Sequence, residues 1–364
     1  MKLQYKNNTQ INLEIPSEVS KFLTDELQNY IVIKNGHIIK RNLNHEYDNV
    51  YINDYNFAIT EKAEMFKMYH SQCVNENESI TYNLENSNSG ILIHVPKNLA
   101  FKDTLKVFYL SDQDEVVSGT TIVVEENSEF KYFEYIVNLG PAKINIFAKC
   151  IIKDNARLVY SGISKINKES SIVINRVAGV KRYGNILFSI AELNDANTIS
   201  NTFIKLNDEY AVGTTKTVAI TSKKQTAKFT QLVSHNAKFT EGYIENYGVS
   251  NDESKLVFEG IGKINKGMKQ SIARQSNKGI VLGATSRLDA NPLLLIDEYD
   301  VVASHGAAIG KIDDEQLYYL MSRGLTFKNA ERLIINGFLS PVLKLLSSDE
   351  LINDFVSSVA NKTA

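Results

Sequence analysis

Apolar and polar residues alternate with a period of two from Gly90 to about Val302, as in a β-strand that buries one face. Clear examples are the runs GILIHV, TLKVFYL, TTIVV and KINIFAKCII. Helical periodicity nearly vanishes here, and no segment resembles the helix that connects parallel strands in a doubly wound α/β fold. The pattern therefore predicts that the central part of the chain is built from β-strands.

A short polar pattern recurs among these strands: two polar residues, a small residue, a charged residue and a large apolar residue. Its copies are ENSEF from Glu126, DNARL from Asp154, HNAKF from His235 and DESKL from Asp252. A second repeat relates GISKINK from Gly162 to GIGKINK from Gly260. Polar turns followed by alternating strands are what a β-solenoid needs, because its coils stack with apolar residues inside and tight turns at the corners.

The copies are irregularly spaced, so a strict hexapeptide or nonapeptide helix is not predicted. A sandwich of two antiparallel sheets is the alternative, and it would need hairpin turns between neighbouring strands. Asn-Gly and Asp-Gly dipeptides, the strongest hairpin signals, are scarce in this region. We therefore favour a β-solenoid.

The pattern of the preceding residues, 1–85, predicts a small region of mixed helices and strands. A helix is expected over Ser17–Tyr30, and a hairpin is expected in YIVIKNGHII, where Asn35-Gly36 is a good turn. Glu61–Tyr69 is a further helix candidate. The apolar stripe of the first helix would contain Val19, Phe22, Leu23 and Leu27.

After Ile312 the periodicity becomes helical. Asp313 suits an N-cap with Gln316 three residues on, and Gly324 suits the position after the helix. The buried stripe of this helix would be Leu317, Leu320 and Met321.

Three more helices are expected beyond it. Thr326 would cap the second, which carries Ala330, Leu333 and Ile334, and Gly337 would end it. Ser340-Pro341 would open the third, and the Ser-x-x-Glu box at 347–350 would open the fourth. The predicted domains are thus 1–85, a solenoid over 86–312, and a helical subdomain over 313–364.

Composition narrows the function classes. Forty Lys and Arg against 42 Asp and Glu leave a net charge of −2, which gives no reason to expect binding to nucleic acid or an anionic membrane. The sequence shows no signal-peptide core and no apolar run long enough for a membrane span. Cys73 and Cys150 are its only cysteines, without a CxxC motif. These features predict a cytoplasmic protein.

The glycine-rich stretch from Gly306 to Lys311 invites comparison with a phosphate-binding loop. A Walker A loop needs four residues between its glycines and a Ser or Thr after the lysine. Here three residues separate Gly306 from Gly310, and Ile312 replaces the hydroxyl. An autonomous ATPase is therefore excluded.

Other candidate chemistry is sparse. The six histidines are scattered singly, and a lone histidine is more often structural than a ligand. Alternation would place Glu298 and Asp300 on one strand face and Asp297 on the other, which favours a solvated strand over a metal site.

The segment from Ser304 to Phe338 reads SHGAAIGKIDDEQLYYLMSRGL and continues through NAERLIINGF. In this order it closely resembles the C-terminal signature of the SufB/SufD family of iron–sulfur cluster assembly proteins. GILIHVP from Gly90, FEGIGKI from Phe258, Gln275-x-Asn277 and Asp289-x-x-Pro292 resemble the family's core. The signature residues present are Ser304, His305, Gly306, Ala307, Gly310, Ile312, Asp313, Gln316, Leu317, Tyr319, Leu320, Ser322, Arg323, Gly324, Ala330, Leu333, Gly337 and Phe338.

The resemblance implies a right-handed parallel β-helix with helical parts at both ends, and Gly306, where SufB-like members carry Glu, makes the chain SufD-like. It implies a non-enzymatic scaffold that pairs with a SufB-type subunit and binds a SufC-type ATPase through its C-terminal helices. A transient iron–sulfur cluster would form near the subunit interface, with His305 as the site residue and tentative metal ligand and no tightly bound cofactor. The candidate ATPase-binding residues are Gln316, Leu317, Tyr318, Tyr319, Leu320, Arg323 and Phe338.

The chain departs from the family pattern in places. Ala303 replaces the cysteine that commonly lies two residues before the histidine, so a cluster contact from this subunit would depend on His305. The usual Leu-Glu-Ile run reads Leu294-Leu295-Ile296, and the Ala-Asp-Asp triplet reads Glu298-Tyr299-Asp300.

Two alternatives to the paired SufD-like scaffold stay open. One is a SufBD-type homodimer that works without a separate SufB. The other, from a different class, is a β-solenoid carbohydrate-binding or carbohydrate-active protein, which the absence of tryptophan makes less favourable.

Overall fold

Two parallel β-sheets form the body of the molecule. The structure, a computed structural model, describes residues 14–24, 27–71, 77–87, 89–343 and 348–363. The first sheet contains β5 (Leu105–Ser111), β7 (Glu129–Asn138), β9 (Arg157–Lys165), β11 (Asn185–Glu192), β13 (Val212–Thr221), β15 (Glu241–Ser250), β17 (Ile272–Val281) and β19 (Val302–Gly310). The second contains β4 (Ser89–Val95), β6 (Glu115–Val124), β8 (Lys143–Ile152), β10 (Ser171–Val180), β12 (Asn197–Leu206), β14 (Thr226–His235), β16 (Lys255–Ile264) and β18 (Arg287–Ile296).

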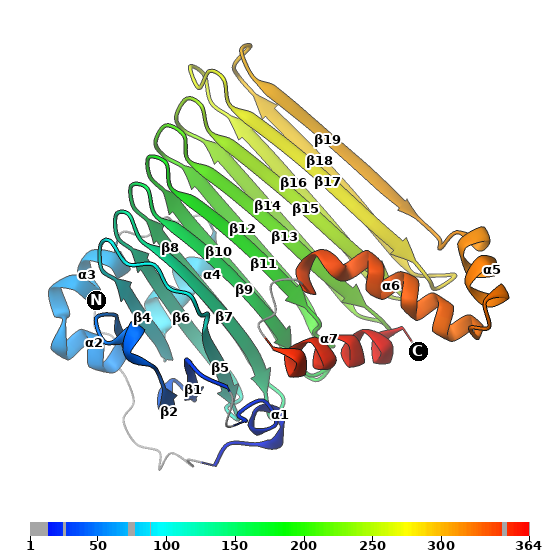
Figure 1. The fold of residues 1–364 in the computed structure, drawn as a ribbon, viewed down its shortest axis with the longest axis horizontal. Helices are drawn as coiled ribbons and strands as arrows, with labels where there is room; N and C mark the ends of the chain where they lie inside the picture. The colour runs from blue at the N-terminus through cyan, green and yellow to red at the C-terminus, as the bar shows by residue number, and fades with distance from the viewer. Residues whose placement is uncertain (1–13, 25–26, 72–76, 88, 344–347, 364) are drawn as a thin grey trace.

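Successive strands alternate between the two sheets, so the chain winds as a β-solenoid of about eight coils (Figure 1). Each strand pairs in parallel with the strand one coil away, which rules out the sandwich of antiparallel sheets. The coils differ in length: Ser171 pairs with Asn197, whereas Lys255 pairs with Arg287. This irregularity agrees with the uneven spacing of the sequence repeats.

The recurrent polar pattern lies at the corners of the coils. Asn127, Asn155 and Asp252 adopt positive φ angles of 58°, 54° and 55°, a left-handed conformation that Asn and Asp tolerate better than most residues. Neighbouring corners are joined side chain to side chain, since Asn155 Nδ2 donates to Asn127 Oδ1 at 2.9 Å. The patterned segments thus make the tight turns that the sequence predicts.

Asp252 lies on the opposite row of corners, between β15 and β16. Farther along the row that contains Asn127 and Asn155, aromatic residues take over this position. Tyr183, Tyr210 and Phe239 have φ angles of 53°, 61° and 60°, where bulky side chains are rare. Their rings stack in a row, with centroids 4.9 Å apart at both steps.

The interior of the solenoid is largely apolar, but Arg176, Glu134 and Glu192 form a fully buried charge cluster in it. Arg176 Nη2 lies 3.1 Å from Glu134 Oε1, and Arg176 Nη1 lies 3.0 Å from Glu192 Oε1. Tyr160 Oη donates to the other oxygen of Glu134 at 2.7 Å. Buried charges are tolerated only when paired and hydrogen-bonded in this way.

The structure explains why the GISKINK and GIGKINK repeats both begin with glycine. A Cβ on Gly162 would lie 2.7 Å from Glu134 Cγ, and a Cβ on Gly260 would lie 2.6 Å from Gln275 Oε1. In each repeat the first glycine therefore leaves room for a buried polar side chain.

The N-terminal part closes one end of the solenoid. The predicted hairpin is confirmed as β1 (Tyr30–Lys34) and β2 (His37–Asn42), which pair antiparallel around Asn35-Gly36. β1 continues the first sheet and β3 (Tyr51–Asp54) continues the second, pairing antiparallel with β4. A short 3₁₀ helix, His45–Tyr47, lies between β2 and β3.

The first predicted helix is much shorter than expected. α1 covers only Ser17–Ser20, and Tyr30 already belongs to β1. The apolar residues of the expected stripe are buried by tertiary packing and do not form a helical face. Phe22, for example, follows α1 in a turn and packs on the rings of Phe108 and Tyr135.

Three further N-terminal helices lie against the second sheet: α2 (Tyr55–Glu61), α3 (Ala63–Ser71) and α4 (Glu78–Asn86). The helix predicted at Glu61–Tyr69 is confirmed, but Lys62 divides it between α2 and α3. On α2, the ring of Tyr55 fills a space that glycines leave open, since a Cβ on Gly90 or Gly119 would lie 2.3 or 2.7 Å from it.

Three C-terminal helices are described where four were predicted: α5 (Asp314–Ser322), α6 (Phe327–Leu343) and α7 (Asp349–Lys362). α6 runs through Gly337 and Pro341 without a break. Ile335 and Leu339 are fully buried, so packing against the sheet outweighs the two helix-breaking residues.

The caps of these helices were predicted in part. Asp313 caps α5 by accepting from Glu315 N, not through a pair with Gln316, and Gly324 has a φ of 95°. Thr326 Oγ1 accepts from Asn329 N at 3.4 Å. Ser348 caps α7 by accepting from Leu351 N; Ser347, the first residue of the predicted box, is outside the described residues.

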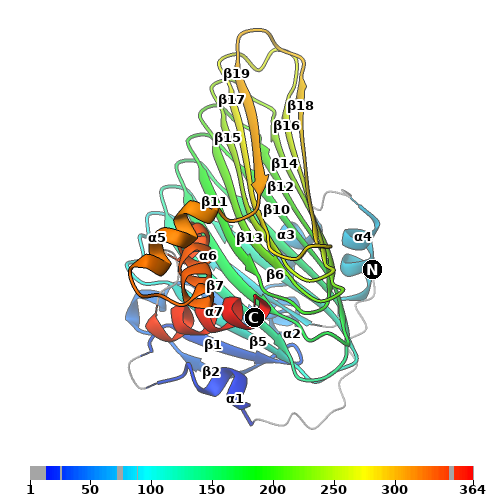
Figure 2. The same ribbon diagram turned by 90° about the vertical axis from the view of Figure 1, so that its right-hand side faces the viewer.

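α6 and α7 cover the outer face of the first sheet, on the side opposite α3 and α4 (Figure 2). Leu351, Phe355 and Val359 of α7 share one buried apolar cluster with α1, the outer face of the sheet and Leu339 of α6. The C-terminal helices are therefore packed into the body of the protein, while the predicted domain boundaries stay a prediction.

Candidate assembly site at the open end of the solenoid

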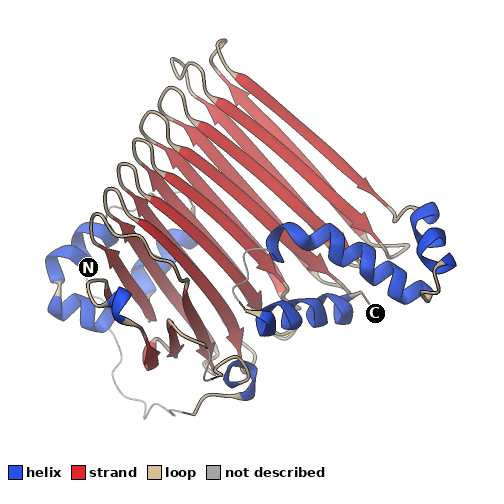
Figure 3. Ribbon diagram, in the orientation of Figure 1, coloured by secondary structure: helices blue, strands red, loops and turns tan. Residues whose placement is uncertain are grey.

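The last coil leaves one end of the solenoid uncovered. β19 is the outermost strand of the ten-stranded sheet and β18 the outermost strand of the nine-stranded sheet (Figure 3). Large apolar side chains are exposed on both strands: Leu293, Leu295, Val302 and Ile309. Long, apolar, unpaired strand edges are sites where another chain can add strands.

Pro292 lies in the middle of β18, opposite Gly260 of β16. Proline has no N–H to give to a sheet and is confined to edge strands. The Asp289-x-x-Pro292 motif of the sequence thus marks an edge.

His305 lies on β19, exposed, directly opposite Gln275 of β17 in the parallel register. Paired residues of neighbouring strands project from the same sheet face, and Gln275 is buried between the two sheets. His305 therefore projects from the inner face of the last coil, over the open mouth of the solenoid. Its imidazole makes no hydrogen bond to any of the described residues.

The surroundings of His305 are small and open. Its neighbours Ser304 and Gly306 are exposed too, and a Cβ on Gly306 would meet nothing within 4 Å. Ala303, in the place of the common cysteine, lies on the same face and is half-buried. A partner can therefore approach the imidazole directly.

His305 offers one exposed side chain that is able to bind a metal. A neutral imidazole is a borderline ligand for iron, and Gln275 Oε1, one strand away, is a buried acceptor without a donor. Among the described residues, no three His, Cys, Asp or Glu side chains gather into a metal site.

The stretch from Gly306 to Gly310 is not a loop. It forms the second half of β19, paired with β17. An extended strand directs successive N–H groups to opposite sides, so they cannot converge on a phosphate as in a Walker A loop.

The acidic run after β18 was misread as a strand. β18 ends at Ile296, and Glu298 lies in the following turn. There its carboxylate accepts from the backbone N–H of Gly267 at 2.9 Å and of Tyr299 at 2.9 Å. Glu298 therefore fastens a corner of the last coil.

The candidate ATPase-binding residues divide between surface and interior. Tyr318 and Tyr319 are 75% and 57% exposed, whereas Leu317 is buried. The ring centroids of Phe338 and Tyr247 lie 5.7 Å apart, so Phe338 helps to hold α6 on the sheet. Met321, expected in the buried stripe of α5, is 43% exposed.

A groove of about 540 Å³ separates α5 from α6. Gln316, Tyr319 and Leu320 line it together with Asp313, Glu315 and Ile334. Arg323 lies over the ring of Tyr319 at 5.3 Å, which fixes the tyrosine at the rim. The structure thus brings four of the seven candidates to one exposed face.

His235 and His94 have roles elsewhere in the fold. His235 is buried in the interior, where its Nδ1 lies 2.7 Å from Thr240 Oγ1, and burial lowers its pKa to about 4. It is a neutral structural histidine. His94 contacts Glu125 at 3.3 Å near the N-terminal helices.

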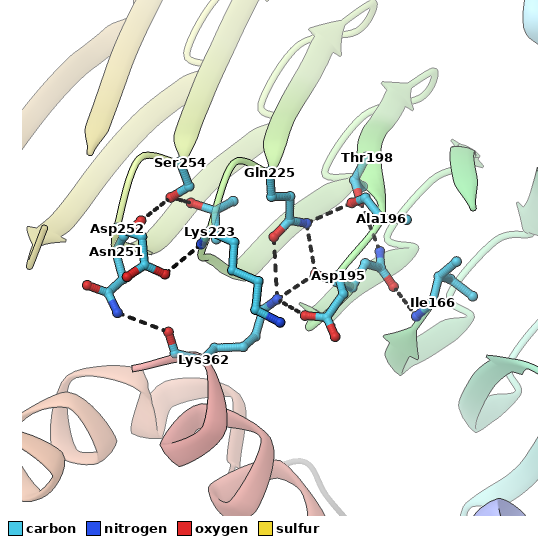
Figure 4. A network of polar contacts seen from close by, with 12 residues as sticks. Ile166, Asp195, Ala196, Thr198, Lys223, Gln225, Asn251, Asp252, Ser254 and Lys362 are labelled. Carbon is cyan, nitrogen blue, oxygen red and sulfur yellow. Dashed lines mark hydrogen bonds and ion pairs between the residues drawn. The ribbon is translucent and has the colours of Figure 1, made fainter. Parts of the chain in front are cut away.

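Residues that fasten α7 were missed by the sequence. Lys362 Nζ reaches into the sheet and lies 2.7 Å from Asp195 Oδ1 and 2.7 Å from the Asn194 carbonyl (Figure 4). Asp354, two turns earlier, contacts Lys21 at 2.7 Å and Lys165 at 3.1 Å. These partners are far away in sequence, so no local spacing predicts the contacts.

The sequence matches one known family and several of its members. The family profile described as SUF system FeS cluster assembly, SufBD core domain, matches residues 108–338. An iron-sulfur cluster assembly protein SufD from Bacillus subtilis is 34% identical over 309 residues, covering 83% of this chain and 71% of the relative. An iron-sulfur cluster assembly SufBD family protein from Staphylococcus saprophyticus is 26% identical over 351 residues, covering 92% and 73%.

The match includes most of the solenoid, α5 and the part of α6 up to Phe338. Among the helices that the structure describes, none has the length and hydropathy of a membrane span. The chain belongs to the SufB/SufD family and is SufD-like.

Proposed function

We propose that this chain is a scaffold subunit for iron–sulfur cluster assembly, which holds partners and cargo rather than catalysing a reaction. The observation that carries the proposal is the open end of the solenoid, where His305 projects between two exposed strand edges. The family membership and the SufD relative support it. No nucleic acid or membrane partner is proposed.

The partner at the open end is a SufB-type subunit. Strand edges with exposed leucine, valine and isoleucine side chains fit a second solenoid that offers edges of its own, because strand addition joins backbone groups and buries the apolar side chains. The nascent cluster would lie at this junction as transient cargo. His305 supplies one ligand from this side, and the partner supplies the soft ligands that Ala303 cannot.

The second partner is a SufC-type ATPase, bound at the α5 face. Tyr318 and Tyr319 are exposed aromatic residues of α5, and Tyr319 also lines the groove. Aromatic residues are common anchors of protein interfaces. Leu317 and Phe338 would act from below by holding α5 and α6 in place.

Co-expression with a SufB-type subunit and a SufC-type ATPase tests the assembly. We expect a complex containing all three, and Tyr318→Ala with Tyr319→Ala should remove the ATPase while the other two stay together. Phe57→Ala, an equally exposed aromatic on α2, is the matched control. Retention of the ATPase by the double variant would contradict the α5 surface.

Deleting the chain from Asp313 onward is a poor test of ATPase binding at α5. It would uncover the outer face of the first sheet, where α6 and α7 bury Ile335, Leu339 and Phe355. Loss of the ATPase would then report misfolding rather than a lost contact.

His305→Ala tests the site itself. We expect the complex to assemble normally but to contain less iron after anaerobic reconstitution, with Ser304→Ala as the neighbouring control. Normal iron content would show that His305 does not bind the cargo. A self-paired complex that loads iron without a SufB-type subunit would favour the homodimer instead.

A further inference from the structure

The ion pairs that join neighbouring coils run in one direction. Lys216 of β13 lies 3.1 Å from Glu245 of β15, the residue opposite it in the register. Lys228 of β14 lies 3.1 Å from Glu259 of β16. Further pairs of this kind are Lys97–Glu126, Lys181–Asp208, Arg182–Glu209 and Lys224–Glu253. In each of them the base lies on the earlier coil, and the acid lies one coil nearer the open end.

The last two strands of the first sheet depart from this pattern. Arg274 and Lys278 are exposed on β17 and project from the outer face of the sheet, because they alternate with inward residues such as the buried Gln275. The residues paired with them on β19 are Ser304 and Ala308. Among the residues that the structure describes, no carboxylate lies within ion-pair distance of either base. The sheet thus reaches its edge with two unmatched bases.

The outer face of β19 leaves these bases a free path to the edge. Ser304, Gly306 and Ala308 are small and exposed, and a Cβ on Gly306 would meet nothing within 4 Å. Neighbouring strands lie roughly 5 Å apart, so a strand added to β19 would lie roughly 10 Å from β17. A long base from one side and an acidic side chain from the other can together cover this gap, because the stems of Arg and Lys lie readily along a surface.

The charge of this face decides which kind of partner fits it. The outer faces of β17 and β19 carry no Asp or Glu: their residues are Ile272, Arg274, Ser276, Lys278, Ile280, Val302, Ser304, Gly306, Ala308 and Gly310. If β19 paired with β19 of a second copy about a two-fold axis perpendicular to the sheet, both copies would bring the same bases to the junction. Like charges across an interface oppose association, whereas carboxylates on the added strand would favour it.

We propose that Arg274 and Lys278 are the specificity-determining pair of the open edge: they bind carboxylates on the edge strand of the partner and oppose pairing with a second copy of this chain. The strand that follows β19 then supplies the acids, and the direction of the ion pairs within the body continues into the partner. This inference rests on the proposed function, since it states the chemistry of the partner at the same edge.

Arg274→Glu with Lys278→Glu tests the inference in the full chain. Calorimetric titration with a purified SufB-type subunit, at low and at high salt, measures the affinity. We expect the unchanged chain to bind more weakly as the salt concentration rises, and the reversed variant to bind about 10- to 100-fold more weakly at low salt. Lys168→Glu with Lys224→Glu changes the net charge equally at two exposed residues on earlier corners, and is the control.

Self-association of the chain alone is the second measurement. Arg274→Gln with Lys278→Gln removes the like charges, so analytical ultracentrifugation should show this variant to self-associate about tenfold more readily than the unchanged chain. Unchanged self-association would overturn the part of the inference that concerns a second copy. A rise without any loss of partner binding in the reversed variant would overturn recognition of the partner's carboxylates.

Equal weakening of partner binding by the control would also overturn the inference. The proposed function survives that result if Leu295→Lys on β18 still weakens binding, because the edges would then pair without help from the bases. If the unchanged chain does not bind a SufB-type subunit at all, the proposed function itself fails.

Discussion

The two ends of the solenoid are built in opposite ways. At the N-terminal end the outermost strands are β2 and β3, both added antiparallel to their neighbours. β2 carries Lys40 and Arg41 in its exposed half, and β3 has only four residues. At the other end the outermost strands have ten and nine residues, with leucine and isoleucine exposed.

Short strands and edge charges are the usual means by which proteins prevent unwanted strand pairing. The N-terminal end uses both, whereas the C-terminal edge strands are long, and the charges of β18, Arg287 and Asp289, pair with each other near its start. The two ends therefore differ in kind: the N-terminal end closes the stack, and the C-terminal end leaves strand edges that a second molecule can pair with.

The largest expected effect tests the closed end. Tyr55→Ala should lower the free energy of unfolding by about 3–5 kcal/mol, because it empties the space between α2 and the glycines of the sheet. Urea denaturation measures it. Leu295→Ala at the open end should change stability by less than about 0.5 kcal/mol, and similar losses in both variants would remove the distinction between the ends.

The next prediction concerns pairing at the open end. Leu295→Lys puts a charge on the apolar edge of β18 and should weaken binding of a SufB-type subunit about tenfold or more. Analytical ultracentrifugation or a titration of purified subunits measures it. Ile199→Lys changes a similarly exposed residue in the middle of the second sheet, and equal weakening by this control would show that the edge is not the interface.

A smaller effect should appear with pH where α7 meets the body. Tyr135 Oη, Lys21 and Lys165 surround the carboxylate of Asp354. Burial alone would raise the pKa of Asp354, but these hydrogen bonds and charges outweigh it and lower the pKa below the ordinary 3.8. The contact therefore stabilises the fold above about pH 4 and is lost as the pH falls through the native pKa.

Asp354→Asn should accordingly cost about 1–2 kcal/mol at pH 7, and the difference from the unchanged chain should narrow below pH 4. Urea denaturation at pH 7 and pH 3 measures both values. Asp208→Asn, at an exposed ion pair with Lys181, should change stability by less than about 0.5 kcal/mol at either pH. A cost that is the same at pH 3 would contradict the ionic contact.

The smallest effect is expected at the corner that changes from asparagine to aromatic residues toward the open end. Tyr210→Asn relieves a left-handed tyrosine but removes ring stacking with Tyr183 and Phe239. The two terms have similar size, so thermal denaturation should show a change below about 1 kcal/mol. A loss above about 2 kcal/mol would show that the stacked rings hold the coils together.

Much of the fold could be predicted because its signals are local. Alternation along each strand and the polar corners at Asn127 and Asn155 depend on neighbouring residues only. The helix expected over Ser17–Tyr30 failed where packing decided the outcome, since Phe22 and Leu27 contribute to a buried cluster without forming a helical stripe. The same holds for Pro341, which stays inside a helix pressed against the sheet.

The candidate site could be predicted only in part. His305 was found from the resemblance, but spacing alone left it a lone histidine. The sequence marks Gln275 only as part of a motif. The orientation of its carboxamide follows from contacts with Leu293 and two glycines on other strands. Contacts that join residues so far apart leave no periodic trace in the sequence.

Only three residues, Lys311–Asp313, connect the end of β19 to the start of α5. A fully extended segment of that length spans roughly 10 Å, so it has almost no slack. A partner that moves α5 would therefore also move β19, the strand that carries His305. The short connection therefore couples the position of α5 to that of β19 at the open end of the solenoid.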